Sequence, residues 1–155
     1  MNWQRKENLV LSVVITSTVI ILMLLFIALP ARAETVFPSA RFPQIFSSQA
    51  VTNGTSETSS AEYIGDSNGD FSIQYYVAGS GTVKVEYLLS LDGTNYLEPS
   101  SASDIATGIT NSSGPNSDGR DIVTFDTELG EYMKIKVTET GGTNNATVDM
   151  YLGRQ

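Results

Sequence analysis

The sequence predicts an all-β protein: an antiparallel β-sandwich, jelly-roll-like, preceded by an N-terminal signal or anchor helix. Three observations lead to this fold class. Beyond residue 33, short runs alternate between apolar and polar residues, which is the pattern of strands with one buried face. Turn-forming Gly, Asp and Asn residues separate these runs. In the same region no segment keeps the 3.6-residue apolar period of an amphipathic helix over ten residues.

The first 33 residues differ in composition from the rest. Arg5 and Lys6 precede an uncharged run of 21 residues, 9–29, which Pro30 ends. Ala31-Arg32-Ala33 then supplies small residues at the −3 and −1 positions of a signal-peptidase site. We therefore predict a signal peptide over residues 1–33. An uncleaved membrane anchor is the alternative, because about 20 apolar residues span a bilayer.

Both interpretations place the remaining chain outside the cytoplasm, with the basic residues before position 9 inside. A cleaved chain would be extracellular or at the cell surface. A chain that keeps residues 1–33 would be periplasmic or membrane-anchored, and this segment would be its only contact with the membrane.

Residues 34–60 are predicted to form an extended arm, since they contain Pro38, Pro43 and a tail rich in Ser and Thr. Proline cannot donate to the ladder of a central strand, so any strand that the arm adds would lie at a sheet edge. Residues 61–155 are assigned to the β-sandwich domain.

We predict one strand over residues 59–64, which begins at the end of the arm, and five alternating strands within the domain. Their core-facing residues are Phe71, Ile73, Tyr75 and Val77; Val83, Val85, Tyr87 and Leu89; Val123 and Phe125; Met133, Ile135 and Val137; and Val148, Met150 and Leu152. Residues 78–81 form the turn of a hairpin, and Asp92-Gly93, Asp118-Gly119 and Gly141-Gly142 end other runs. Residues 98–120, rich in Ser, Gly, Asn and Pro, are predicted to be a long loop.

The composition excludes several kinds of chemistry. The chain has no His and no Cys, so it offers no imidazole base, no thiolate nucleophile and no ordinary zinc site. Its net charge is −8, whereas nucleic-acid affinity depends on Lys and Arg neutralising phosphates. We therefore expect no nucleic-acid partner.

We also predict that the protein is not an enzyme. A glycosidase pairs two carboxyl groups, one with a raised pKa, but the acidic residues here lie in turns and on polar strand faces. A Ser–Lys pair is disfavoured, because Lys84, Lys134 and Lys136 are expected on the solvent faces of strands. A secreted hydrolase is therefore the least favoured function.

One segment suggests calcium. Asp66, Asn68 and Asp70 place oxygen ligands at alternate positions, which suits a hard cation. The alternative is a tight turn leading into the strand at Phe71, because Asp, Asn and Gly are also turn formers. No other cofactor is predicted.

Four tyrosines are candidate ligand-binding residues. Tyr76, Tyr132 and Tyr151 fall on the outward faces of their strands, and Tyr96 follows the Asp92-Gly93 turn. Aromatic platforms with a few polar groups are typical of sugar sites. The alternative is that they are ordinary exposed strand residues; clustering in a concave patch would favour binding.

Two stretches resemble discoidin-type, galactose-binding-like jelly rolls. Residues 87–96 (YLLSLDGTNY) are similar to the hairpin of those modules in which a Ser, an Asp-Gly turn and an aromatic residue follow a strand, and residues 130–137 (GEYMKIKV) are similar to a later strand. The resemblance implies a jelly-roll sandwich more than an activity. The order of segments is also similar to that of short exported bacterial β-sandwich proteins of unassigned function.

Taken together, the sequence favours a non-catalytic exported structural or surface protein of the adhesion type. Self-association is one expected interaction of such a protein, and binding to a surface polymer or glycan is another. The alternative function is a small carbohydrate- or ligand-binding module.

Overall fold

The computed structural model describes residues 42–100 and 104–154. The predicted signal peptide or anchor, residues 1–33, lies outside this range, as does the start of the predicted arm, residues 34–41. In the described part of the chain, no helix is both long enough and apolar enough to cross a membrane.

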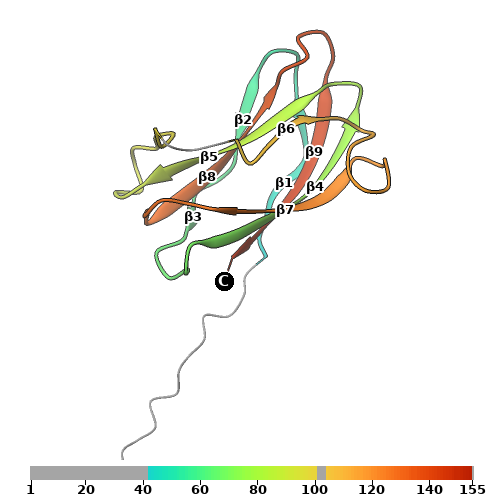
Figure 1. The fold of residues 1–155 in the computed structure, drawn as a ribbon. Helices are drawn as coiled ribbons and strands as arrows, with labels where there is room; N and C mark the ends of the chain where they lie inside the picture. The colour runs from blue at the N-terminus through green and yellow to red at the C-terminus, as the bar shows by residue number, and fades with distance from the viewer. Residues whose placement is uncertain (1–41, 101–103, 155) are drawn as a thin grey trace, which may run out of the picture. The chain divides into compact units, whose positions relative to one another are not determined.

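The described residues form two antiparallel sheets (Figure 1). Sheet A has the strand order β1 (Gln44–Val51), β9 (Ala146–Arg154), β4 (Asp70–Gly79) and β7 (Arg120–Asp126). Sheet B has the order β2 (Ser56–Thr58), β8 (Tyr132–Glu139), β5 (Val83–Ser90) and β6 (Ala106–Ile109), and β3 (Glu62–Tyr63) also pairs with β8. These sheets confirm the predicted all-β antiparallel sandwich.

The core lies between the sheets because the apolar residues of each alternating strand point to the inner face. Ile73, Val77 and Met150 of sheet A are buried, as are Val85 and Ile135 of sheet B. Each such side chain contributes about 1.5–3 kcal/mol when it is fully buried.

Aromatic rings connect three strands of the core. Phe125 of β7 stacks on Phe71 of β4 and on Tyr87 of β5, with ring centroids 5.6 and 5.7 Å apart. The Tyr87 hydroxyl donates a 2.7 Å hydrogen bond to Glu128. Burial, helped by this contact, raises the pKa of Tyr87 to about 12. Tyr75 is also buried, so both tyrosines lie in the core as their register predicts.

Part of the segment expected as an arm lies in the sandwich. β1 pairs with β9 and β2 pairs with β8, so each forms an edge of one sheet. Ile45, Phe46 and Val51 of β1 are buried.

The sequence predicts a loop over residues 98–120, and the structure differs within it. Residues 106–109 form β6, whose Ile109 is buried and pairs with Val83 of β5. The loop prediction is wrong there because one buried side chain in a polar segment gives no alternating pattern.

The buried carboxylate of Glu139 holds three turns together at one end of the sandwich. It accepts hydrogen bonds from the backbone N–H groups of Gly54 (3.0 Å), Thr82 (3.2 Å), Gly141 (2.8 Å) and Gly142 (2.9 Å). The Gly54 N–H, together with the other three, outweighs burial and lowers the pKa of Glu139. Glu139 therefore remains ionised and has a structural role.

Candidate functional site

The outer face of sheet A carries a cleft of about 400 Å³. The strand register places its main residues in two neighbouring rows across β9, β4 and β7, which are Asp149, Tyr76 and Arg120, and Tyr151, Gln74 and Ile122. Pro115, from the connection between β6 and β7, also lines it. The antiparallel register thus gathers residues from distant parts of the sequence into one concave surface, which we call the tyrosine cleft.

Tyr76 lies between a hydrogen-bond acceptor and a set of donors. The Arg120 guanidinium carbon is 4.6 Å from the centroid of the Tyr76 ring, a cation–π contact. On the other side, the Asp149 carboxylate accepts a 2.8 Å hydrogen bond from the backbone N–H of Ser48. Ser48 has a left-handed φ of 48° in the irregular part of β1. The bend in β1 therefore positions the acceptor beside the aromatic ring.

A second cleft, of about 420 Å³, lies on the same face of sheet A. Its floor comes from the next two rows, which are Gly153, Ser72 and Thr124, and Asp70 and Asp126. Phe42 borders it as well and is 68% exposed. We call this second hollow the Phe42 cleft.

The four candidate tyrosines divide into two pairs. Tyr76 and Tyr151 line the tyrosine cleft, whereas Tyr96 and Tyr132 lie over sheet B. The Tyr132 ring packs edge-on against Tyr63 at 5.5 Å, and the Lys134 ammonium lies 4.2 Å from the Tyr96 ring centroid. Burial raises the pKa of Tyr96. Tyr96 and Tyr132 thus make local packing contacts.

The candidate calcium residues make other contacts in the structure. The Asp66 carboxylate forms a 3.0 Å ion pair with Arg154. The Asn68 side chain accepts a hydrogen bond from the Asp70 N–H at 3.2 Å, which is a turn interaction. No group of three or more acidic residues among residues 42–100 and 104–154 is arranged to hold a metal ion. Calcium binding at this segment stays a prediction.

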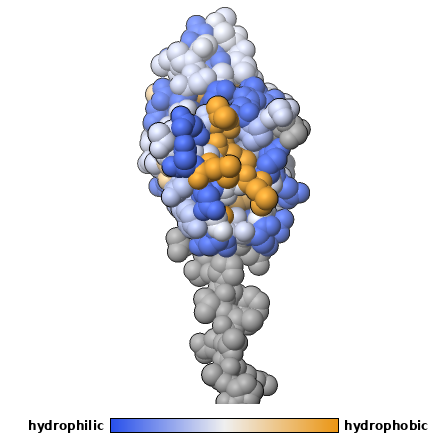
Figure 2. Space-filling model, turned by 90° about the vertical axis from the view of Figure 1, so that its left-hand side faces the viewer, coloured by the Kyte–Doolittle hydropathy of each residue, from blue (hydrophilic) through white to orange (hydrophobic). Residues whose placement is uncertain are grey.

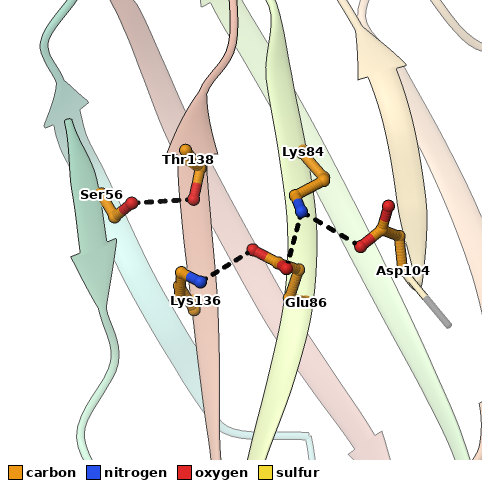
Figure 3. A network of polar contacts seen from close by, with 6 residues as sticks. All are labelled: Ser56, Lys84, Glu86, Asp104, Lys136 and Thr138. Carbon is orange, nitrogen blue, oxygen red and sulfur yellow. Dashed lines mark hydrogen bonds and ion pairs between the residues drawn. The ribbon is translucent and has the colours of Figure 1, made fainter. Parts of the chain in front are cut away.

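An ion-pair network on sheet B buries a second carboxylate, that of Glu86 (Figure 3). Glu86 lies 2.7 Å from Lys84 and 3.0 Å from Lys136, and Lys84 also lies 3.2 Å from Asp104. Burial alone would raise the pKa of Glu86, but the two lysines outweigh it and lower the value. Glu86 therefore differs from a general acid, which needs a raised pKa.

The end of the sandwich near the turn after β5 exposes apolar residues. Leu91, Leu97 and Leu129 line a shallow cleft together with Leu89, and Leu129 is 97% exposed. Figure 2 looks onto an apolar patch surrounded by polar residues. We call Leu91, Leu97 and Leu129 the leucine patch.

Sequence reasoning identified Tyr76 and Tyr151 but missed their neighbours. Gln74 and Asp149 lie two residues before Tyr76 and Tyr151 on the same outward strand faces, so the alternation of each strand could have found them. Arg120 enters the tyrosine cleft through the pairing of β7 with β4, for which no local pattern exists. Glu86 had a usable signal: it is flanked by Lys84 on its own strand and pairs with Lys136 on the next.

No family model matches the chain, and no curated protein matches it. The carbohydrate-binding module CBM36, solved in complex with calcium and xylotriose, aligns with a TM-score of 0.37 and 17% identity over 72% of this chain and 97% of its own. A structure of infectious bursal disease virus, Gx strain, aligns with a TM-score of 0.37 and 9% identity over 77% of this chain and 32% of its own. The CBM22-1 xylan-binding domain of Paenibacillus barcinonensis Xyn10C aligns with a TM-score of 0.34 and 12% identity over 70% of this chain and 86% of its own. The chain has distant structural similarity to these three structures, and its β-sandwich fold is established by its own two sheets.

Proposed function

We propose that the protein is a non-catalytic module that binds a glycan in the tyrosine cleft. The observation that carries this proposal is the placing of Tyr76 and Tyr151 in one concave surface together with Asp149 and Arg120. A sugar ring offers C–H groups that pack on an aromatic face, and hydroxyls that both donate and accept hydrogen bonds. The cleft supplies aromatic rings, an acceptor and a set of donors within one site.

Two further features support binding without catalysis. Glu86 and Glu139 are buried, and their surroundings lower both pKa values, which disfavours proton donation near neutral pH. The export predicted from residues 1–33 would place the cleft outside the cytoplasm, where cell-surface and environmental polysaccharides are found.

The proposal predicts that Tyr151→Ala weakens glycan binding by about tenfold or more, since losing one stacked ring costs on the order of 1.4 kcal/mol. Retardation in gels that contain soluble polysaccharides, followed by calorimetry with each polysaccharide that retards the protein, would measure this. Tyr63→Ala is the matched control, because Tyr63 is 45% exposed on sheet B and Tyr151 is 39% exposed on sheet A. Equal binding by both variants would contradict the assignment of the cleft.

The leucine patch favours a second candidate function, a surface protein that self-associates. Exposed contiguous apolar side chains mark interaction sites in soluble proteins. A second copy of the chain would remove these leucines from water without needing a different partner. In this arrangement the tyrosine cleft, which lies on the outer face of sheet A, would play no part in assembly.

Under this candidate we expect Leu129→Ser combined with Leu97→Ser to reduce the oligomer size in light scattering at high protein concentration. Ile122→Ser is the control, because Ile122 is an exposed apolar residue of the tyrosine cleft. A monomeric parent protein, or an oligomer unchanged by the double substitution, would exclude self-association through these leucines.

A further inference from the structure

The tyrosine cleft and the Phe42 cleft are neighbours on one surface. The row of Tyr151 and Gln74 is followed directly by the row of Gly153 and Ser72, two residues along each strand. The distance along β4 from Asp70 to Tyr76 is six residue steps, or about 20 Å. The two clefts therefore follow one another along β4, with Pro115 near one end and Phe42 near the other, and we call the two together the groove.

Each part of the groove has its own aromatic side chain. Tyr76 and Tyr151 line the tyrosine cleft, and Phe42 lines the Phe42 cleft. Gly153 lets the Phe42 ring lie close to the sheet: a Cβ at that position would collide with the Ser72 hydroxyl and lie 3.4 Å from two Phe42 ring carbons. A single sugar ring can use one cleft, whereas a chain of several rings can use both.

The charges of the groove select against acidic ligands. Asp70 and Asp126 lie directly opposite each other in neighbouring strands, and Asp149 adds a third carboxylate. Arg154 reaches the second cleft, but its guanidinium is paired with Asp66. Along the groove, the positive charge of Arg120 is therefore outnumbered by the three carboxylates of Asp70, Asp126 and Asp149. A uronic-acid or sulfated chain would be repelled, particularly beside Asp70 and Asp126.

Uncharged hydroxyls meet no such barrier. They donate to the carboxylates and to the Gln74 carbonyl, and they exchange hydrogen bonds with Ser72 and Thr124. We propose that the groove binds an internal stretch of a linear, uncharged glycan chain that spans both clefts. This inference rests on the proposed function and adds to it the length and the charge class of the ligand.

The test is calorimetry of the purified full chain with linear oligosaccharides of glucose, xylose, mannose or galactose, from disaccharide to hexasaccharide, and with oligogalacturonides of the same lengths. We expect one neutral hexasaccharide to bind at least about tenfold more tightly than its disaccharide and than the matching oligogalacturonide. Phe42→Ala should remove the gain from length, so that the variant binds the hexasaccharide no more tightly than the disaccharide. Tyr151→Ala should weaken both.

Three results would overturn the inference while the proposed function stands. These are equal binding of disaccharide and hexasaccharide, equal binding of neutral and acidic chains, and a Phe42→Ala protein that keeps the full gain from length. In each of these cases Tyr151→Ala would still weaken binding. A protein that binds no member of the panel, neutral or acidic, would instead remove the proposed function and the inference together.

Discussion

Replacing Glu139 by Gln is expected to lower the melting temperature by about 10 °C or more. The carboxylate accepts four backbone hydrogen bonds that come from three separate turns. A glutamine of the same shape turns an NH₂ group toward some of these donors, so those N–H groups lose their acceptor. The remaining hydrogen bonds also lose the negative charge of the buried carboxylate, which strengthens all four in the parent protein. The turns containing Gly54 and Thr82 would then lose their common partner.

Thermal unfolding followed by circular dichroism would measure the effect. Glu57→Gln is the matched control, because Glu57 lies on the adjacent strand β2 and is only partly buried. The control is expected to change the melting temperature by no more than about 2 °C. If Glu139→Gln and Glu57→Gln had the same melting temperature, the four hydrogen bonds at Glu139 would contribute nothing to stability.

The stabilities of the parent protein and of Glu139→Gln are also expected to depend differently on pH. The folded-state pKa of Glu139 is lowered, so its contribution to stability is fully present above its unfolded pKa of about 4.3. That contribution is lost as the pH falls through the lowered folded value. The difference in melting temperature between the parent protein and Glu139→Gln should therefore shrink on acidification. Glu86 and Asp92 also have lowered pKa values, but both proteins contain them, so their effects cancel in the difference.

The strands could be predicted from the sequence because burial of one sheet face leaves a period of two in the chain itself. Phe71, Ile73, Tyr75 and Val77 show that period, and all four are buried in β4. A short strand such as β6 has too few residues to show this alternation, and for that reason the sequence did not predict it.

The site was only partly predictable, since it depends on which strands are neighbours. Tyr76 could be assigned to an outward face from its own strand alone. Arg120 and Asp149 flank Tyr76 because β4 pairs with β7 on one side and with β9 on the other. These strands are far apart in sequence. In the same way, Phe42 joins the groove because it lies near Gly153 at the other end of the domain.

Gly119→Ala is expected to destabilise the protein by about 3 kcal/mol. Gly119 has a φ of +76°, and a Cβ there would collide with the Val77 carbonyl oxygen and lie 3.2 Å from backbone atoms of Asn111. Its own carbonyl accepts the Val77 N–H at 2.9 Å. The clash involves backbone on both sides, so the start of β7 must shift to relieve it. Urea unfolding would measure the loss.

Gly108→Ala separates the clash from the unfavourable backbone angle. Gly108 has a similar φ of +67°, but a Cβ there would meet nothing within 4 Å. Gly108→Ala should therefore destabilise the protein by only about 1 kcal/mol, which is the cost of placing an alanine in the left-handed backbone conformation. Equal losses for the two variants would mean that backbone conformation alone sets the cost and that Gly119 packs no more tightly than Gly108.

The shift at Gly119 also reaches the proposed site. Arg120 is the next residue, and its guanidinium lies over Tyr76 in the tyrosine cleft. Gly119→Ala should therefore weaken glycan binding by about tenfold at temperatures where the variant is still folded, whereas Gly108→Ala should not, because Gly108 lies on β6 of sheet B. If folded Gly119→Ala bound a glycan as tightly as the parent protein, the position of Arg120 over Tyr76 would not matter for recognition. The donor side of the cleft would then have to be assigned to the Gln74 amide and the tyrosine hydroxyls that also line it.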